Sequence, residues 1–249
     1  MKTFTALIFL FSSLIVNAQT TGRAAPLQKD SKFYLGWNYT PEISYRFLSE
    51  GSDANASTAE TIKQRNANEL KQYSQSGNIF VGYVLSDRFS IEAGIGYSSF
   101  GYAEQPDDII AFEWEPGYDK VIGFKQNYNR LHVVSIPVNF RTYFWNKRVR
   151  PFIAAGASLG MVLQYVRSKR YVYDSGTKHK WQEYDGKEQF STFHLIGQIS
   201  TGVDIHVSNN VRLRVAPRFQ ITTNSIYAAK EIRGNYYNVG IEFGAVCKL

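Results

Sequence analysis

The stretch that decides the fold is KFYLGWNYTPEISYRF, which runs from Lys32 to Phe47. Its side chains alternate between two kinds without a break. The even positions are mostly polar, small or charged, and the odd positions are Phe33, Leu35, Trp37, Tyr39, Pro41, Ile43, Tyr45 and Phe47. Because successive side chains of a β-strand point to opposite faces, this alternation predicts a long strand with one apolar and one polar face.

The same two-residue period recurs along the rest of the chain. With 249 residues, of which 44% are hydrophobic and 15% aromatic, the chain is large enough for one all-β domain. No apolar stretch of about 18 residues follows the N-terminal segment, so the sequence offers no membrane-spanning helix. The apolar sides of the further strands fall within residues 79–85, 89–97, 134–144, 153–165, 193–207, 211–221 and 237–249.

Short and long connections alternate between these eight segments. The short ones are rich in turn-forming residues and cover 86–88, 145–148 and 208–210, whereas the long ones cover about 48–77, 101–130, 166–190 and 223–235. This order predicts an all-β protein, an eight-stranded antiparallel up-and-down transmembrane β-barrel with short periplasmic turns and long extracellular loops.

The long connections have patterns of their own. Ser57-Thr58-Ala59-Glu60 matches a helix capping box and predicts a short helix in the first long loop. In the second, Ile110, Phe112 and Trp114 alternate towards Pro116-Gly117, and in the third, residues 171–173 lead into Asp174-Ser175-Gly176. Both patterns predict hairpins that extend strands beyond the bilayer.

Alternation alone leaves open which face points inward, because a soluble lipocalin-like barrel also alternates. The interior of an eight-stranded barrel is just wide enough for side chains to fill, and the apolar phase here is too bulky for it. Glycines make room for neighbouring side chains in a crowded strand. The glycines within the expected strands occupy polar-phase positions, with Gly197 as the exception. We therefore expect the polar phase inside and the apolar phase in lipid. The polar-phase glycines are Gly36, Gly82, Gly94, Gly96, Gly156, Gly160, Gly202, Gly240 and Gly244.

Four prolines lie inside the expected strands, at positions 41, 137, 151 and 217. Each removes a backbone hydrogen-bond donor from the ladder. A closed barrel has no edge strand, where a missing donor would leave no partner unsatisfied. We expect β-bulges, or strand portions outside the bilayer, at these points.

The first residues have the pattern of an export signal, with Lys2, an apolar core over residues 4–16 and small residues up to Ala18. We expect residues 1–18 to be a signal peptide cleaved after Ala18, residues 19–31 a short periplasmic leader, and residues 32–249 the outer-membrane β-barrel domain. Cys247 is the only cysteine, so no internal disulfide holds the fold.

Residues 131–163 read LHVVSIPVNFRTYFWNKRVRPFIAAGASLGMVL. This stretch resembles the outer-membrane β-barrel family common in Bacteroidetes, often likened to PorT-type barrels, in its Ile136-Pro137 strand, its aromatic end, its charged turn and its Pro151-Phe152 strand. Residues 238–243, NVGIEF, also resemble the signal that barrel-assembly machinery reads. The resemblance implies a fold and a location in the cell outer membrane, and no catalytic motif.

The inward phase contains ten charged residues that we expect to form a polar network plugging the lumen, since unpaired buried charges cost several kcal/mol. A gated path or small-ligand pocket favouring anions is the alternative. The ten residues are Glu42, Arg46, Glu92, Arg141, Arg150, Asp204, Arg212, Arg214, Arg218 and Glu242.

The sequence predicts no catalytic residue, no cofactor and no metal ligand. His194, Asp204 and His206 share the inward phase of one strand, but the two histidines are twelve residues apart and lie near its opposite ends. A single catalytic triad therefore cannot use both.

Two long loops carry opposite charges, which favours hairpins that attract each other, or a surface for outer-leaflet head groups or a partner. The acidic loop contains Asp107, Asp108, Glu113, Glu115 and Asp119, and the basic loop Arg167, Lys169, Arg170, Lys178, Lys180 and Lys187. We expect outer-membrane lipid and lipopolysaccharide, the barrel-assembly machinery, and a protein at the extracellular loops as partners. We expect no nucleic acid, because the basic residues are scattered.

The sequence thus favours a non-enzymatic outer-membrane barrel with structural, adhesive or accessory roles. A lipid A-modifying enzyme of the deacylase or acyltransferase type, an accessory barrel of a secretion system and a soluble lipocalin-like barrel are the alternatives. The enzyme requires a hydroxyl, a carboxylate and a histidine that meet near the outer leaflet.

Overall fold

A computed structural model describes residues 32–111, 120–145, 147–185, 190–227 and 231–249. The chain from Lys32 to Leu249 forms one compact unit. The expected signal peptide and leader, residues 1–31, lie outside the described residues. Within the described residues, no helix has the length and apolar character needed to cross a membrane.

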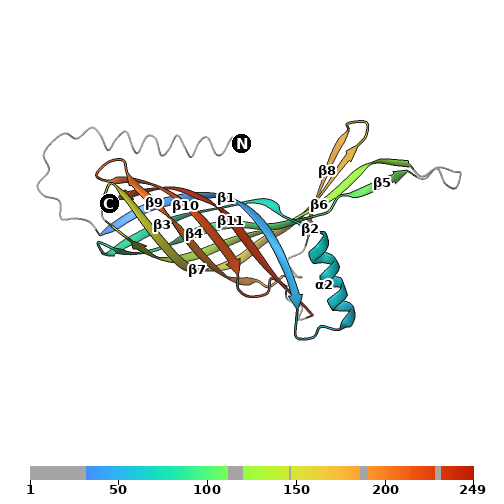
Figure 1. Ribbon diagram of the computed structural model, residues 1–249, viewed down its shortest axis with the longest axis horizontal. Coiled ribbons are helices and arrows are strands. Elements are labelled where there is room, and N and C mark those ends of the chain that lie inside the picture. The colour runs from blue at the N-terminus through green and yellow to red at the C-terminus, as the bar shows by residue number, and fades with distance from the viewer. Residues whose placement is uncertain (1–31, 112–119, 146, 186–189, 228–230) are drawn as a thin grey trace, which may run out of the picture. The chain divides into compact units, whose positions relative to one another are not determined.

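Eight antiparallel strands close into a ring, which confirms the predicted barrel (Figure 1). The sheet order β4-β3-β1-β11-β10-β9-β7-β6 is closed by a pairing between β4 and β6. The ring strands are β1 (Phe33–Glu50), β3 (Gln72–Ser86), β4 (Phe89–Glu104), β6 (Lys120–Tyr143), β7 (Val149–Tyr173), β9 (Phe193–His206), β10 (Val211–Thr222) and β11 (Ile232–Lys248).

The three short turns lie where the sequence places them, between β3 and β4, between β6 and β7, and between β9 and β10. We call this end of the barrel the turn end and the opposite end the loop end. The loop end carries α2 (Ala56–Asn68), β2 (Glu69–Leu70), β5 (Asp107–Ala111) and β8 (Lys178–Asp185). Strand β5 pairs with β6, and β8 pairs with β7, which confirms the strand pairing of both predicted hairpins. Phe112, Trp114 and the turn expected at Pro116-Gly117 lie outside the described residues.

The helix expected in the first long loop is present, but it begins before the predicted capping box. Asn55 is its N-cap, and the Asn55 side chain accepts a hydrogen bond from the backbone N–H of Thr58 at 3.0 Å. Asn66, in the last turn, fixes the helix to β1. Its amide donates to the carbonyl of Leu48 at 2.9 Å and accepts from the Leu48 N–H at 3.0 Å.

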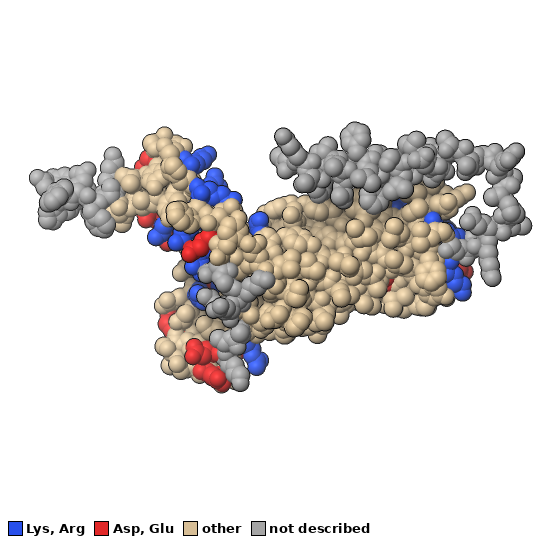
Figure 2. Space-filling view, turned by 180° about the vertical axis from the view of Figure 1, so that it is seen from behind, with Lys and Arg blue, Asp and Glu red and all other residues tan. Residues whose placement is uncertain are grey.

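The outer wall of the barrel is apolar and its interior is polar, as the sequence predicts. Ile79 and Ile95, which face each other across β3 and β4, are 57% and 69% exposed. On the face shown in Figure 2, charged side chains gather towards the two ends, and the wide band between them consists mostly of other residues. A soluble barrel would show the reverse arrangement, so the lipocalin-like alternative does not fit.

Glycines of the inward phase make room for large inward side chains. A Cβ built on Gly82 would overlap the ring of Tyr34, and one on Gly36 would overlap the ring of Phe80. Both aromatic rings are almost fully buried. The volume argument from the sequence is therefore correct at these positions, because each ring occupies the space that a side chain on the neighbouring strand would need.

The bulges expected at the strand prolines are absent. Among the described strand pairs, register shifts occur only between Val84 and Ser86, between Ile109 and Ile110, and between His132 and Val133. At Pro41, the pairing of β1 with β11 passes over two residues and resumes in the same register, while the pairing of β1 with β3 continues through Pro41. A missing donor thus interrupts one ladder locally without inserting a residue.

A bulge in β7 changes the face on which its later residues lie. His132 pairs with Gln164 and Val133 pairs with Val162, so Leu163 is the extra residue. Tyr165, predicted to face lipid, is instead 4% exposed, and its hydroxyl donates to Asn129 Oδ1 at 2.6 Å. The prediction for Tyr165 was wrong because the extra residue reverses the alternation beyond it.

Val138 lies on the exposed outer wall of β6, between Ile136 and Phe140 and away from both ends of the barrel. We expect Val138→Arg to lower the free energy of unfolding by about 2–4 kcal/mol, the cost of a cation on the lipid face near the bilayer centre. The measurement is a urea titration of the protein folded in lipid vesicles, followed by tryptophan fluorescence. Thr177→Arg, in the exposed turn before β8, is the control and should change stability by less than about 0.5 kcal/mol. Equal stability of both variants would contradict the assignment of the outer wall to lipid.

Candidate functional site

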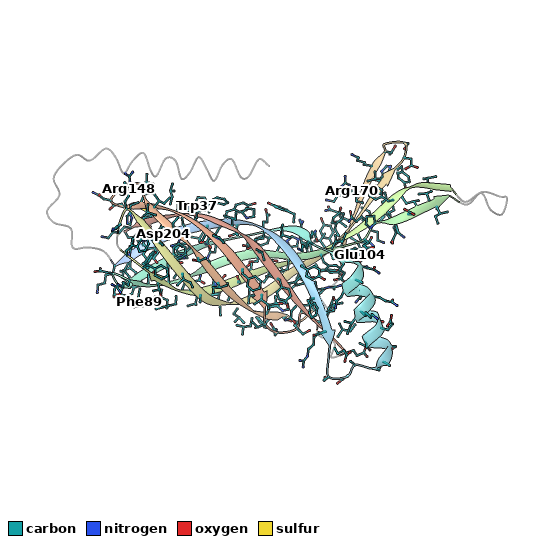
Figure 3. The ribbon with its side chains drawn as sticks, viewed as in Figure 1. Trp37, Phe89, Glu104, Arg148, Arg170 and Asp204 are labelled. Atoms are coloured by element: carbon teal, nitrogen blue, oxygen red, sulfur yellow. The ribbon has the colours of Figure 1, made fainter. Side chains whose placement is uncertain are left out.

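Arg214 forms an ion-pair cluster that crosses the lumen near the turn end. It lies on β10 and Glu92 lies on β4, and these strands are on opposite sides of the ring. Arg214 Nη2 is 2.9 Å from Glu92 Oε1, and Arg214 Nε is 2.9 Å from Asp204 Oδ1 on the adjacent strand β9. The labelled Asp204 in Figure 3 marks this level of the barrel. One guanidinium thus ties together walls that are far apart in the sheet.

Further donors surround the two carboxylates of this cluster. Arg141 Nη2 donates to Glu92 Oε2 at 3.0 Å, and the Tyr34 hydroxyl donates to Glu92 Oε1 at 3.0 Å. The Tyr143 hydroxyl donates to Asp204 Oδ2 at 2.8 Å. Charge-assisted hydrogen bonds of this kind offset the cost of removing the carboxylates from water. Their oxygens are consequently occupied by protein donors.

A second polar layer lies next to this cluster. Glu42 accepts hydrogen bonds from Ser76 Oγ at 2.8 Å and from Asn238 Nδ2 at 2.7 Å. Arg218 Nη1 is 3.8 Å from Glu242 Oε2. The cavity between the two layers measures about 10 Å³, which is room for about one water molecule.

A third layer, at the loop end, joins the barrel to the first long loop. Arg46 forms an ion pair with Glu69 of β2 and donates a hydrogen bond to the Tyr227 hydroxyl. The guanidinium carbon of Arg46 lies 3.5 Å from the centroid of the Tyr102 ring, a cation–π contact. Burial raises the pKa of the Glu69 carboxyl, and the hydrogen bond from Arg46 opposes that rise.

An apolar cluster fills the lumen at the same level. The cluster was not predicted, because residues 101–130 and 166–190 were expected to form loops. The signal was present in β4, where Phe100 and Tyr102 occupy the inward parity beyond the polar residues. The buried members are Phe100, Tyr102, Leu131, Val133, Val162, Tyr165, Phe190, Ile196, Ile226 and Tyr236.

Nine of the ten predicted lumen residues are buried, and they divide among the three layers. Glu92, Arg141, Asp204, Arg212 and Arg214 form the cluster near the turn end, with Arg212 Nη1 3.7 Å from Asp204 Oδ2. Glu42, Arg218 and Glu242 form the second layer, and Arg46 belongs to the third. Arg150 is half-buried at the turn end, where its Nη2 donates to the Asp87 carbonyl at 2.7 Å.

The histidines of β9 do not form a site with Asp204. His194 is fully buried and pairs in register with Gly160, whereas His206 lies at the turn end with its Nδ1 3.3 Å from the Arg148 carbonyl oxygen. Asp204 is held by Arg214 and Tyr143 instead. Among the described residues, no group of three or more His, Cys, Asp or Glu side chains is placed to hold a metal ion.

Comparison with known families agrees with this inside-out architecture. Residues 17–227 match the family described as outer membrane protein beta-barrel domain. The chain belongs to this family. Its location is therefore the outer membrane, with the turn end of the barrel in the periplasm and the loop end outside the cell.

Several solved structures of outer membrane proteins are similar to this barrel. Neisserial surface protein A is 14% identical with a TM-score of 0.42, and the match covers 89% of this chain and 100% of that one. The Escherichia coli outer membrane protease OmpT is 10% identical with a TM-score of 0.44, over 92% and 100% of the two chains. The Yersinia pestis attachment invasion locus protein Ail is 9% identical with a TM-score of 0.34, over 87% and 99%. No curated protein sequence matches this chain significantly.

We expect Arg214→Leu to lower the free energy of unfolding by about 3–5 kcal/mol, because it leaves two buried carboxylates without their shared cation. The measurement is equilibrium unfolding in lipid vesicles. Lys63→Leu, on the exposed face of α2, removes the same charge from the surface and should change stability by less than about 0.5 kcal/mol. A loss below about 1 kcal/mol for Arg214→Leu would show that the cluster does not brace the barrel.

Proposed function

We propose that this barrel is a non-enzymatic, non-conducting outer membrane component that presents its loop end to a partner protein at the cell surface. The observation that carries the proposal is the filled lumen. Side chains of all eight strands occupy it in three layers, and the cavity between two of these layers measures only about 10 Å³. With the interior filled, the surfaces that remain for function are the outer wall and the two ends.

The loop end has features that suit a protein partner. Within the described strand pairs, β5 pairs only with β6 and β8 pairs only with β7, so each has an edge without a neighbouring strand. Such an edge can accept an added strand from another protein. Trp181 and Tyr184 on β8 are 65% and 66% exposed, and aromatic residues of this type are enriched at protein interfaces.

The remaining sequence-based expectations belong to the same proposal. They are cleavage of the signal after Ala18, insertion by the barrel-assembly machinery, contact with lipopolysaccharide, and the relation to PorT-type barrels.

We expect the purified protein to produce no stepwise conductance in a planar lipid bilayer, because buried side chains occupy the lumen in three layers. A general porin inserted under the same conditions is the positive control. Reproducible single-channel steps from the wild-type protein would contradict the non-conducting assignment and favour the gated path.

A lipid A-modifying enzyme is the second candidate, because a hydroxyl and a histidine meet on the outer wall. The Tyr97 hydroxyl lies 2.5 Å from His132 Nδ1. The described residues place no carboxylate in hydrogen-bond contact with His132, so the third group that this chemistry requires is missing from the described part of the chain.

Purification from native membranes in mild detergent, followed by mass spectrometry, separates the two candidates. We expect a stoichiometric protein companion with the wild type and its loss with the double variant Trp181→Ala/Tyr184→Ala. We expect the acyl composition of co-purified lipid A to match that of cells lacking the protein. An altered acyl count that reverts with His132→Ala would favour the enzyme, and a solitary barrel would contradict the partner proposal.

A further inference from the structure

A groove of about 650 Å³ lies at the loop end, on the outward face of the sheet formed by β6, β7 and β8. Its lining includes Tyr128, Arg130 and His132 of β6, Arg170 of β7, and Lys180 and Tyr184 of β8. Figure 3 shows the labelled Arg170 on the part of β7 that extends beyond the ring. This groove is separate from the lumen, and it shares Tyr184 with the exposed aromatic pair of β8.

The groove lies on the same outward face of β6 as the lipid-facing wall, further towards the loop end. On β6, the outward side chains of Ile136, Val138 and Phe140 are exposed and apolar, and the outward residues nearer the loop end are His132 and Arg130. The boundary between the two zones therefore falls between residues 132 and 136.

An aromatic pair marks that boundary. The rings of Tyr97 and His132 stack with their centroids 5.9 Å apart. Amphipathic rings of this kind collect where hydrocarbon meets head groups. The apolar wall thus ends at the head-group level, and the groove lies directly beyond it, level with the polar part of the outer leaflet.

The charge of the groove lacks a counterpart in the described part of the chain. Arg170 and Lys180 are directly opposite each other in the β7–β8 register, and like charges in that position destabilise a sheet. The described lining contains three cationic side chains and no carboxylate. The other face of the same two strands differs, because Arg167 stands opposite Glu183 there. A bound anion in the groove would relieve the repulsion between Arg170 and Lys180.

We propose that this groove binds the phosphate groups of a phosphorylated glycolipid of the outer leaflet, of the lipopolysaccharide type, with its acyl chains along the apolar wall of β6 and β7. A free anion would use only the cations, and an acidic peptide would use the cations without the wall. The lipid uses both, because its phosphates and its acyl chains are joined at the level where the wall meets the groove. Arg130 also lines the groove, and its Nη2 donates a hydrogen bond to the Tyr73 carbonyl at 3.1 Å.

The test uses the full-length protein in an uncharged detergent, titrated with purified diphosphoryl lipid A and followed by native mass spectrometry. We expect the double variant Arg170→Ala/Lys180→Ala to weaken lipid A binding by about tenfold to thirtyfold, as the loss of two cations near an anionic head group predicts. We expect dephosphorylated lipid A to bind the wild type as weakly as diphosphoryl lipid A binds the double variant.

The matched control is Lys147→Ala/Arg148→Ala, which removes two exposed cations at the turn end and should bind lipid A as the wild type does. Arg130→Gln, on a different strand, is the second test variant if the double variant does not fold. Equal affinity of wild type and groove variants overturns the proposal. Equal binding of dephosphorylated lipid A does so too, and so does displacement of lipid A by an equal concentration of inorganic phosphate.

Discussion

The barrel depends on the ion pairs that Arg214 makes across its interior. A closed sheet in hydrocarbon must satisfy every backbone group internally, and its lumen must hold whatever side chains the second face of each strand provides. Here those side chains are charged, so they are stable only in pairs. Because Glu92 and Arg214 come from opposite walls, their contact at 2.9 Å also fixes the distance between those walls. The same ion pair therefore both neutralises buried charges and sets the width of the barrel.

Much of this arrangement could be predicted from the alternation of apolar and polar side chains. An alternation of this kind predicts a β-strand and also assigns each side chain to one of its two faces. The ring of eight strands, the three short turns and the inward set of charges followed from it. The start of β3 did not, because Gln72, Ser74 and Ser76 alternate with residues that are not strongly apolar. Tyr165 was also misplaced, because a single extra residue at Leu163 reverses the pattern and no local signal marks it.

The division of the inward side chains into three layers could not be predicted from the sequence, for a different reason. Alternation states that Arg46 points inward, but its partner Glu69 lies in a two-residue strand after a helix, where no periodicity exists. The apolar cluster at the loop end combines residues from β4, β6, β7, β9 and β11 with others from the connections between strands. Such contacts depend on the closure of the ring, which only the three-dimensional structure shows.

The filled interior also has a consequence for how such a chain can diverge. Glu92 and Arg214 are 122 positions apart, yet the exchange of either one removes an ion pair from the buried network that holds the other. Substitutions inside the cylinder must therefore occur as coordinated changes on facing walls, whereas the rim beyond the membrane can vary one residue at a time. The loop end can therefore acquire residues that bind new partners while the residues of the lumen change little.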